Sequence, residues 1–165
     1  MRTASDLQYV QHGGFRTAYR KAGDGPPVLL IHGSGPGVSG QANRRGTMSA
    51  DSPVAAQHRL LAPDVVGFGA TTSDPNVPLD HDSRVSQMIG FITGMDLGRV
   101  DLVGNSMGGA IALAIAHRRP DLVRRMVLMG TVGISFPITP GLDEVWGYTP
   151  SLENMASIVR LFDPR

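Results

Sequence analysis

Residues 100–109 read VDLVGNSMGG, and this stretch is the clearest indication of the fold class. The first four residues are typical of a short buried strand, and the apolar run from Met107 to Arg118 is typical of a helix that ends before Pro120. The five residues that join them, Gly104 to Gly108, have the form G-x-S-x-G. The sequence therefore predicts a strand, a sharp turn and a helix, with Ser106 on the turn.

The glycines of this motif have a steric explanation. A sharp turn forces the serine into a strained backbone conformation, and side chains two positions before and after it would collide with the strand and the helix. The hydroxyl of Ser106 then stands beside a helix N-terminus, whose dipole and free N–H groups favour a developing negative charge. An N-capping serine on a surface turn would also fit the letters, but the position between strand and helix favours a nucleophile.

The sequence on either side of this stretch continues the same alternation. Apolar runs of strand length recur between glycine- and proline-rich breaks, and one stretch has helical spacing although Gly90 and Gly94 weaken it. Strands that alternate with helices predict the α/β class, with a mostly parallel sheet covered on both faces. We expect a hairpin of 7–10 and 15–20, strands at 28–31, 59–62, 100–103 and 127–129, and helices at 85–97 and 107–118.

The chain changes character after Gly130. Four prolines follow, and the strand-helix repeat does not continue. We therefore expect residues 1–134 to form the N-terminal part of an α/β core and residues 135–165 to begin an inserted cap, with the C-terminal half of the core absent.

Composition excludes several classes of function. The 165 residues are 41% hydrophobic, and 15 basic against 14 acidic side chains give a formal charge of +1, so nucleic acid and anionic membranes are not expected partners. The chain has no cysteine, no signal-peptide pattern and no apolar run long enough for a bilayer. These features predict a cytoplasmic protein that binds a small molecule.

A glycine-rich segment, HGSGPGVSG at residues 32–40, follows the strand at 28–31. Its last six residues satisfy G-x-G-x-x-G, and Asp64 closes the next strand, where a ribose-binding acid would lie in a dinucleotide-binding module. Against this alternative, Gly46 interrupts the helix that should receive the pyrophosphate, and Ser106 is left unexplained.

Several longer stretches resemble the α/β-hydrolases that cleave meta-ring-fission products, such as 2-hydroxymuconic semialdehyde hydrolases. The resemblance is carried by VLLIHGSGPGVSG, LLAPDVVGFG, DLVGNSMGGAIALAIA, RRMVLMGTVGISFPIT and GLDEVWGYTPSLENM. It implies hydrolysis of a carbon–carbon bond in 2-hydroxy-6-oxohexa-2,4-dienoates during aromatic hydrocarbon catabolism, without metal or organic cofactor. It also allows a homo-oligomer, and an ester hydrolase of the same fold remains the alternative.

The resemblance implies roles for individual residues. Ser106 is the nucleophile, and the backbone N–H groups of Ser34 and Met107 form the oxyanion hole. Four residues meet the substrate, with the two asparagines at its dienoate end: Gly33, Gly35, Asn43 and Asn105. A helix cap would equally explain Asn43, and a turn would explain Asn105.

The chain departs from the family in its triad. In members of the family, the three catalytic residues follow one another along the chain in the order serine, acid, histidine, and the acid and the histidine come after the cap. Here His117 alone follows Ser106, about 15 Å along the helix axis, too far to take its proton. We therefore expect a truncated chain that is inactive, and a non-catalytic α/β module stays open as a second reading.

Overall fold

The structure is a computed structural model that describes residues 6–35, 37–42, 46–49, 51–147 and 149–162. The chain divides into two compact units, residues 1–133 and 134–165.

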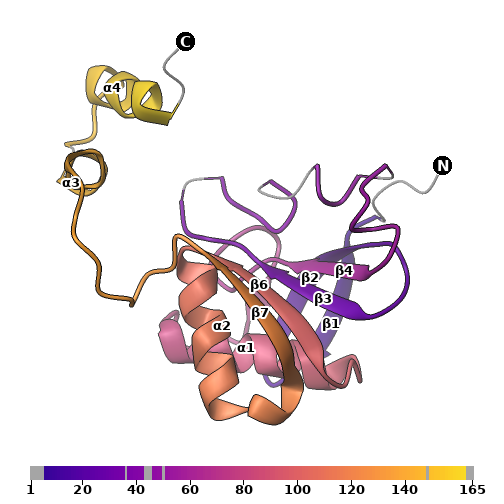
Figure 1. The fold of residues 1–165 in the computed structure, drawn as a ribbon. Coiled ribbons are helices and arrows are strands. Elements are labelled where there is room, and N and C mark those ends of the chain that lie inside the picture. Colours follow the sequence, from indigo (N-terminus) through magenta and orange to yellow (C-terminus); the bar gives the residue numbers. More distant parts are fainter. Residues whose placement is uncertain (1–5, 36, 43–45, 50, 148, 163–165) are drawn as a thin grey trace. The chain divides into compact units, whose positions relative to one another are not determined.

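The first unit is built on one mixed sheet (Figure 1). Its strands run in the order β1-β2-β4-β3-β6-β7, and the short β5 pairs with β2. The pairs β4–β3, β3–β6 and β6–β7 are parallel, whereas β2 pairs antiparallel with β1, β4 and β5. The bounds are β1 Gln8–His12, β2 Phe15–Ala22, β3 Pro27–Ile31, β4 Arg59–Pro63, β5 Thr72–Ser73, β6 Val100–Asn105 and β7 Val123–Met129.

Alternate residues of the central strands pack on opposite faces of the sheet. Leu29 and Ile31 of β3 join a core with the two helices α1 (His81–Gly94) and α2 (Met107–Arg118). Val28 and Leu30 face a smaller core that includes Met48 and Ala55 from the segment after the glycine-rich loop. The prediction of an α/β fold with a mostly parallel sheet is confirmed. On the second face, however, the described residues between 37 and 57 form turns and not the expected helical cover.

The helix predicted at 85–97 begins earlier than expected, at His81, because its N-cap lies upstream, and it ends at Gly94. Asp80 accepts a hydrogen bond from the backbone N–H of Ser83 at 2.8 Å, which caps α1 at His81. Gly90 and Gly94, which weaken this helix, make room for the side chain of His12. A Cβ on Gly90 would lie 2.6 Å from Cδ2 of His12, and one on Gly94 would lie 3.0 Å from its Nδ1. The glycines thus leave a slot on α1 for a side chain of β1.

β7 pairs with β6 alone among the described strands. Arg124 on β7 forms a bidentate ion pair with Asp101 on β6, at 2.8 and 2.6 Å, and these bonds hold the pKa of the Asp101 carboxyl below its usual value. Along the same strand the side chains of Met126, Val127 and Met129 are 38%, 54% and 37% exposed. The strand therefore presents apolar side chains beside an unpaired backbone edge.

Such an edge is a template for pairing with another chain. We expect the 165-residue chain to self-associate through β7, and Val127→Lys to raise the concentration at which association begins by roughly severalfold, because an edge lysine opposes pairing. Light scattering against protein concentration measures this. Val54→Lys is the matched control, since Val54 is also exposed, at 42%, but lies in a turn. Equal effects of both substitutions would contradict association through β7.

The second unit contains two helices, α3 (Pro140–Gly147) and α4 (Leu152–Phe162). Thr139 and Ser151 cap them by accepting from the backbone N–H groups of Leu142 at 3.4 Å and Asn154 at 3.0 Å. A cavity of about 580 Å³ lies within this unit and is lined by residues of both helices. In the described part of the chain, neither these helices nor those of the first unit are long and apolar enough to cross a membrane.

Candidate active site

Ser106 lies between the end of β6 and the first turn of α2, in a backbone conformation rare for a side-chain-bearing residue. Its φ is 53° and its ψ is −117°. Two neighbouring segments hold it there: its N–H donates to the carbonyl of Met129 at 2.9 Å, and its carbonyl accepts from the N–H groups of Gly109 at 2.9 Å and Val132 at 3.4 Å. The predicted sharp turn is therefore present, and the chain on both sides maintains its strain.

The glycines of the motif are required by close backbone approaches. A Cβ on Gly104 would lie 2.5 Å from the carbonyl oxygen of Gly108, and one on Gly108 would lie 2.2 Å from that of Ile31. Neither neighbour can move away, because each is main chain in a helix or a strand. The steric reason inferred from the sequence applies at both positions.

The glycine-rich loop after β3 comes into contact with this turn. A Cβ on Gly33 would lie 3.1 Å from Cβ of Ser106 and 3.4 Å from Nδ2 of Asn105. Since β3 and β6 are neighbouring parallel strands, their carboxyl ends meet at one edge of the sheet. Gly33, Asn105 and Ser106 are thus brought together, and Ser34 follows Gly33 directly in the loop.

His32 is fully buried beneath this loop. Its Nε2 accepts from the backbone N–H of Val65 at 2.9 Å, so the ring proton is assigned to Nδ1, which donates to the carbonyl of Gly33 at 2.7 Å. The ring also packs edge-on against Phe68. With both nitrogens engaged, His32 holds the loop and is not placed to act as the base for Ser106.

The structure contradicts the dinucleotide-binding alternative. The carboxylate of Asp64 accepts from the backbone N–H groups of Gly40 and Ala70, both at 2.8 Å, and the residue is only 6% exposed. Both carboxylate oxygens serve the fold, which leaves no ribose ligand at this position. The described residues at 37–42 and 46–49 form turns, and no helix begins there to receive a pyrophosphate.

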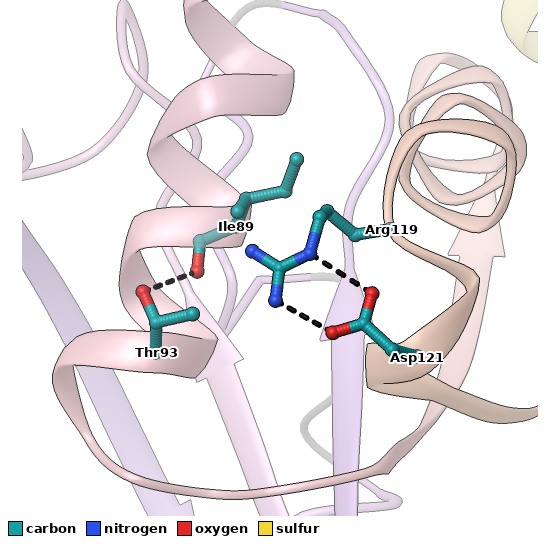
Figure 2. A network of polar contacts seen from close by, with 4 residues as sticks. All are labelled: Ile89, Thr93, Arg119 and Asp121. Atoms are coloured by element: carbon teal, nitrogen blue, oxygen red, sulfur yellow. Dashed lines mark hydrogen bonds and ion pairs between the residues drawn. The ribbon is translucent and has the colours of Figure 1, made fainter.

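His117, the histidine that follows Ser106 in the sequence, and Asp121, the first acidic residue after Ser106, lie at the other end of α2. His117 is exposed on the last turn of this helix. Arg119, just after it, forms a bidentate pair with Asp121 at 2.9 and 2.6 Å, which lowers the pKa of that carboxyl (Figure 2). The guanidinium points toward α1, where the hydroxyl of Thr93 donates to the carbonyl of Ile89 (Figure 2). His117 and Asp121 are therefore not placed to assist Ser106.

Two further residues complete the comparison with the sequence. Asn43, predicted to meet the substrate, lies outside the described residues. Thr131, which was not predicted from the sequence, packs on the first turn of α2: a Cβ on Gly109 would lie 2.2 Å from its Oγ1. It lies two residues after the end of β7, the strand that supports Ser106, and this position at the carboxyl end of a strand is the signal that could have indicated it. Among the described residues, no cluster of histidine, aspartate and glutamate could hold a metal ion.

Several known proteins are similar to this chain in sequence or in fold. A 2-hydroxy-6-oxo-2,4-heptadienoate hydrolase of Pseudomonas putida is 49% identical over 93% of this chain and 54% of its own length. A 2-hydroxymuconate semialdehyde hydrolase of a Pseudomonas species is 46% identical over 90% of this chain and 52% of its own length. The crystal structure of a variant meta-cleavage product hydrolase from Pseudomonas fluorescens, complexed with acetates, superposes with a TM-score of 0.79 at 44% identity, covering 94% of this chain and 56% of that one.

The chain thus spans about half the length of the curated relatives it matches. The family model described as the alpha/beta hydrolase fold matches residues 26–150, which include the loop after β3, the turn at Ser106 and all of α2. This match covers most of the chain. The chain therefore belongs to the alpha/beta hydrolase family.

Proposed function

We propose that this chain is the nucleophile-bearing part of a serine hydrolase that cleaves a carbon–carbon bond in 2-hydroxy-6-oxohexa-2,4-dienoates. The observation that carries the proposal is the strained turn at Ser106 in contact with Gly33 of the HGSGPG loop. Two relatives, a 2-hydroxy-6-oxo-2,4-heptadienoate hydrolase and a 2-hydroxymuconate semialdehyde hydrolase, support the choice of substrate.

The site residues take the following roles in this proposal. After the dienol has ketonised, Oγ of Ser106 attacks the carbonyl carbon at position 6, and the bond between carbons 5 and 6 breaks. The electrons of that bond pass into the ketonised chain, which takes up a proton and leaves as 2-hydroxypenta-2,4-dienoate. Water then releases the acyl group as a carboxylic acid. The N–H groups of Ser34 and Met107 bind the oxyanion, while Gly33, Gly35, Asn43 and Asn105 contact the substrate.

The proton of Ser106 needs an acceptor that the described residues do not place beside it. His32 has both ring nitrogens engaged, and His117 lies at the far end of α2. We therefore propose that residues outside these 165 supply the histidine and its acid partner. The loop at residues 34–35 and Ser106 then form one half of the active site, which lacks a base until the other half is added.

The test compares this chain with a version extended by the C-terminal half of a related hydrolase. Loss of the dienolate absorbance reports turnover of a 2-hydroxy-6-oxohexa-2,4-dienoate, and a nitrophenyl ester is assayed in parallel. We expect dienoate turnover from the extended protein only. Efficient turnover by the 165-residue chain would show that the base is already present, and preference for the ester would replace the proposal with a general esterase.

A further inference from the structure

The segment from Asp64 to Thr71 fastens the glycine-rich loop at both of its ends. At the start of the loop, the N–H of Val65 donates to Nε2 of His32 at 2.9 Å. At its end, the N–H of Gly40 donates to Oδ1 of Asp64 at 2.8 Å. The position of this loop beside Ser106 is therefore set by how the 64–71 segment is itself held.

Gln87 holds that segment from α1. Its Oε1 accepts from the N–H of Val66 at 2.8 Å, and its Nε2 donates to the carbonyl of Asp64 at 3.0 Å and to Oγ1 of Thr17 at 3.1 Å. The residue is 1% exposed. A primary amide buried this deeply is costly unless its donors and acceptor are satisfied, and here they are.

Gln87 and His32 are joined through one planar peptide group. The carbonyl of Asp64 and the N–H of Val65 belong to the same peptide, so a donor that orients the carbonyl also orients the N–H. Gln87 donates to that carbonyl, and the N–H opposite it donates to His32. The hydroxyl of Thr71 donates to the same carbonyl at 2.7 Å, which makes it a second support of this peptide.

The same geometry repeats on the far side of the imidazole. Nδ1 of His32 donates to the carbonyl of Gly33. That carbonyl shares its peptide group with the N–H of Ser34, the predicted oxyanion donor. Each group in this series donates a hydrogen bond to the next. The Gln87 amide donates to the 64–65 peptide, that peptide donates to the imidazole, and the imidazole donates to the 33–34 peptide. Aligned hydrogen bonds polarise one another, which strengthens the donor at the end of the series.

We propose that Gln87 is a positioning residue that orients and polarises the backbone N–H of Ser34 through this relay of two peptides and the ring of His32. The relay ends on the oxyanion donor, and to that extent it rests on the proposed function. Gln87 itself is held in α1 and acts only through its hydrogen bonds, so its removal should alter the donor strength of Ser34 more than substrate binding.

The test uses Gln87→Met, which keeps the length of the side chain and removes its three hydrogen bonds. Thr17→Val is the matched control, because it also removes a buried hydrogen bond of Gln87 but leaves the relay intact. In the 165-residue chain we expect the amide proton signals of Val65 and Ser34 to move upfield in Gln87→Met and to stay in place in Thr17→Val. Equal shifts in both variants, or none in Gln87→Met, would overturn the relay.

A second measurement does not depend on the variant folding. In the unsubstituted chain, nitrogen NMR of the His32 ring should show Nδ1 protonated and Nε2 coupled across the hydrogen bond to the N–H of Val65. A ring protonated at Nε2 would refute the relay.

Activity of the extended protein separates the relay from the proposed function. We expect Gln87→Met to lower kcat about 5-fold with KM nearly unchanged, and Thr17→Val to leave both within about 2-fold. An effect of Gln87→Met on KM alone would contradict the proposed role. If the spectra shift as expected but the unsubstituted extended protein hydrolyses no dienoate, the relay to Ser34 stands and the proposed function falls.

Discussion

Ser106→Ala is expected to lower dienoate turnover by the extended protein at least about 10⁴-fold, because only the hydroxyl oxygen can form the covalent bond to the substrate carbonyl. Substrate binding should change little, since the methyl side chain leaves the loop after β3 and the N-terminus of α2 in place. Single-turnover absorbance measurements, with titration of the substrate at equilibrium, separate the two quantities. Turnover within about 10-fold of the unsubstituted enzyme would mean that water, and not Ser106, attacks the carbonyl.

Ser106→Gly is the informative companion of this variant. Glycine also removes the hydroxyl, but it accepts a φ of 53° without steric cost. Relief of strain should outweigh the greater freedom of glycine in the unfolded chain, so the free energy of unfolding should rise by about 1 kcal/mol relative to Ser106→Ala. Equal stability of the two variants would show that the turn stores no strain.

Gly108→Ala is expected to destabilise the chain by about 3–5 kcal/mol, although alanine is ordinarily the better residue in a helix. The added Cβ would lie 2.2 Å from the carbonyl oxygen of Ile31 and 2.6 Å from that of His32, and both are main-chain atoms at the end of β3. The helix and the strand must separate to admit it, which opens the core beneath Ser106. Thermal unfolding should show the loss as a fall in Tm of roughly 10 °C.

Gly46→Ala is the control for this substitution. A Cβ at Gly46 meets nothing within 4 Å, and its backbone is not in the left-handed region. Its effect on the free energy of unfolding should lie within about 0.5 kcal/mol of zero. A Gly108→Ala protein as stable as the Gly46→Ala protein would mean that the contact between α2 and β3 is looser than the structure shows.

Local patterns predicted much of the fold because their causes are local. The hairpin around Gly13 and Gly14, the buried strand of β3 and the helix Met107–Arg118 each follow from the composition and spacing of a few adjacent residues. The turn at Ser106 was predictable for the same reason, since its glycines are demanded by atoms within the motif and at the end of the neighbouring strand.

Helices and strands that depend on contacts with a distant segment of the chain were predicted less well. Gly90 and Gly94 weaken α1 when they are considered as helix residues, and only the folded chain shows that His12 occupies the space they leave. The length of β7 was underestimated because Arg124 and Arg125 near its start are polar and exposed, although β6 pairs with this part of the strand through the backbone.

The sequence predicted the class of fold correctly and indicates Ser106 as the candidate nucleophile, because a strand, a glycine-flanked serine and an apolar helix leave few other conformations for 100–118. The contacts that hold the loop beside Ser106 could not be predicted in this way, because they join residues that are far apart in the sequence. His32, Asp64 and Gln87 are polar residues in three separate segments, and nothing in their spacing shows that one hydrogen-bonded network connects them through the peptide between Asp64 and Val65. Their roles arise when burial removes water and each polar atom must find a partner in another part of the chain.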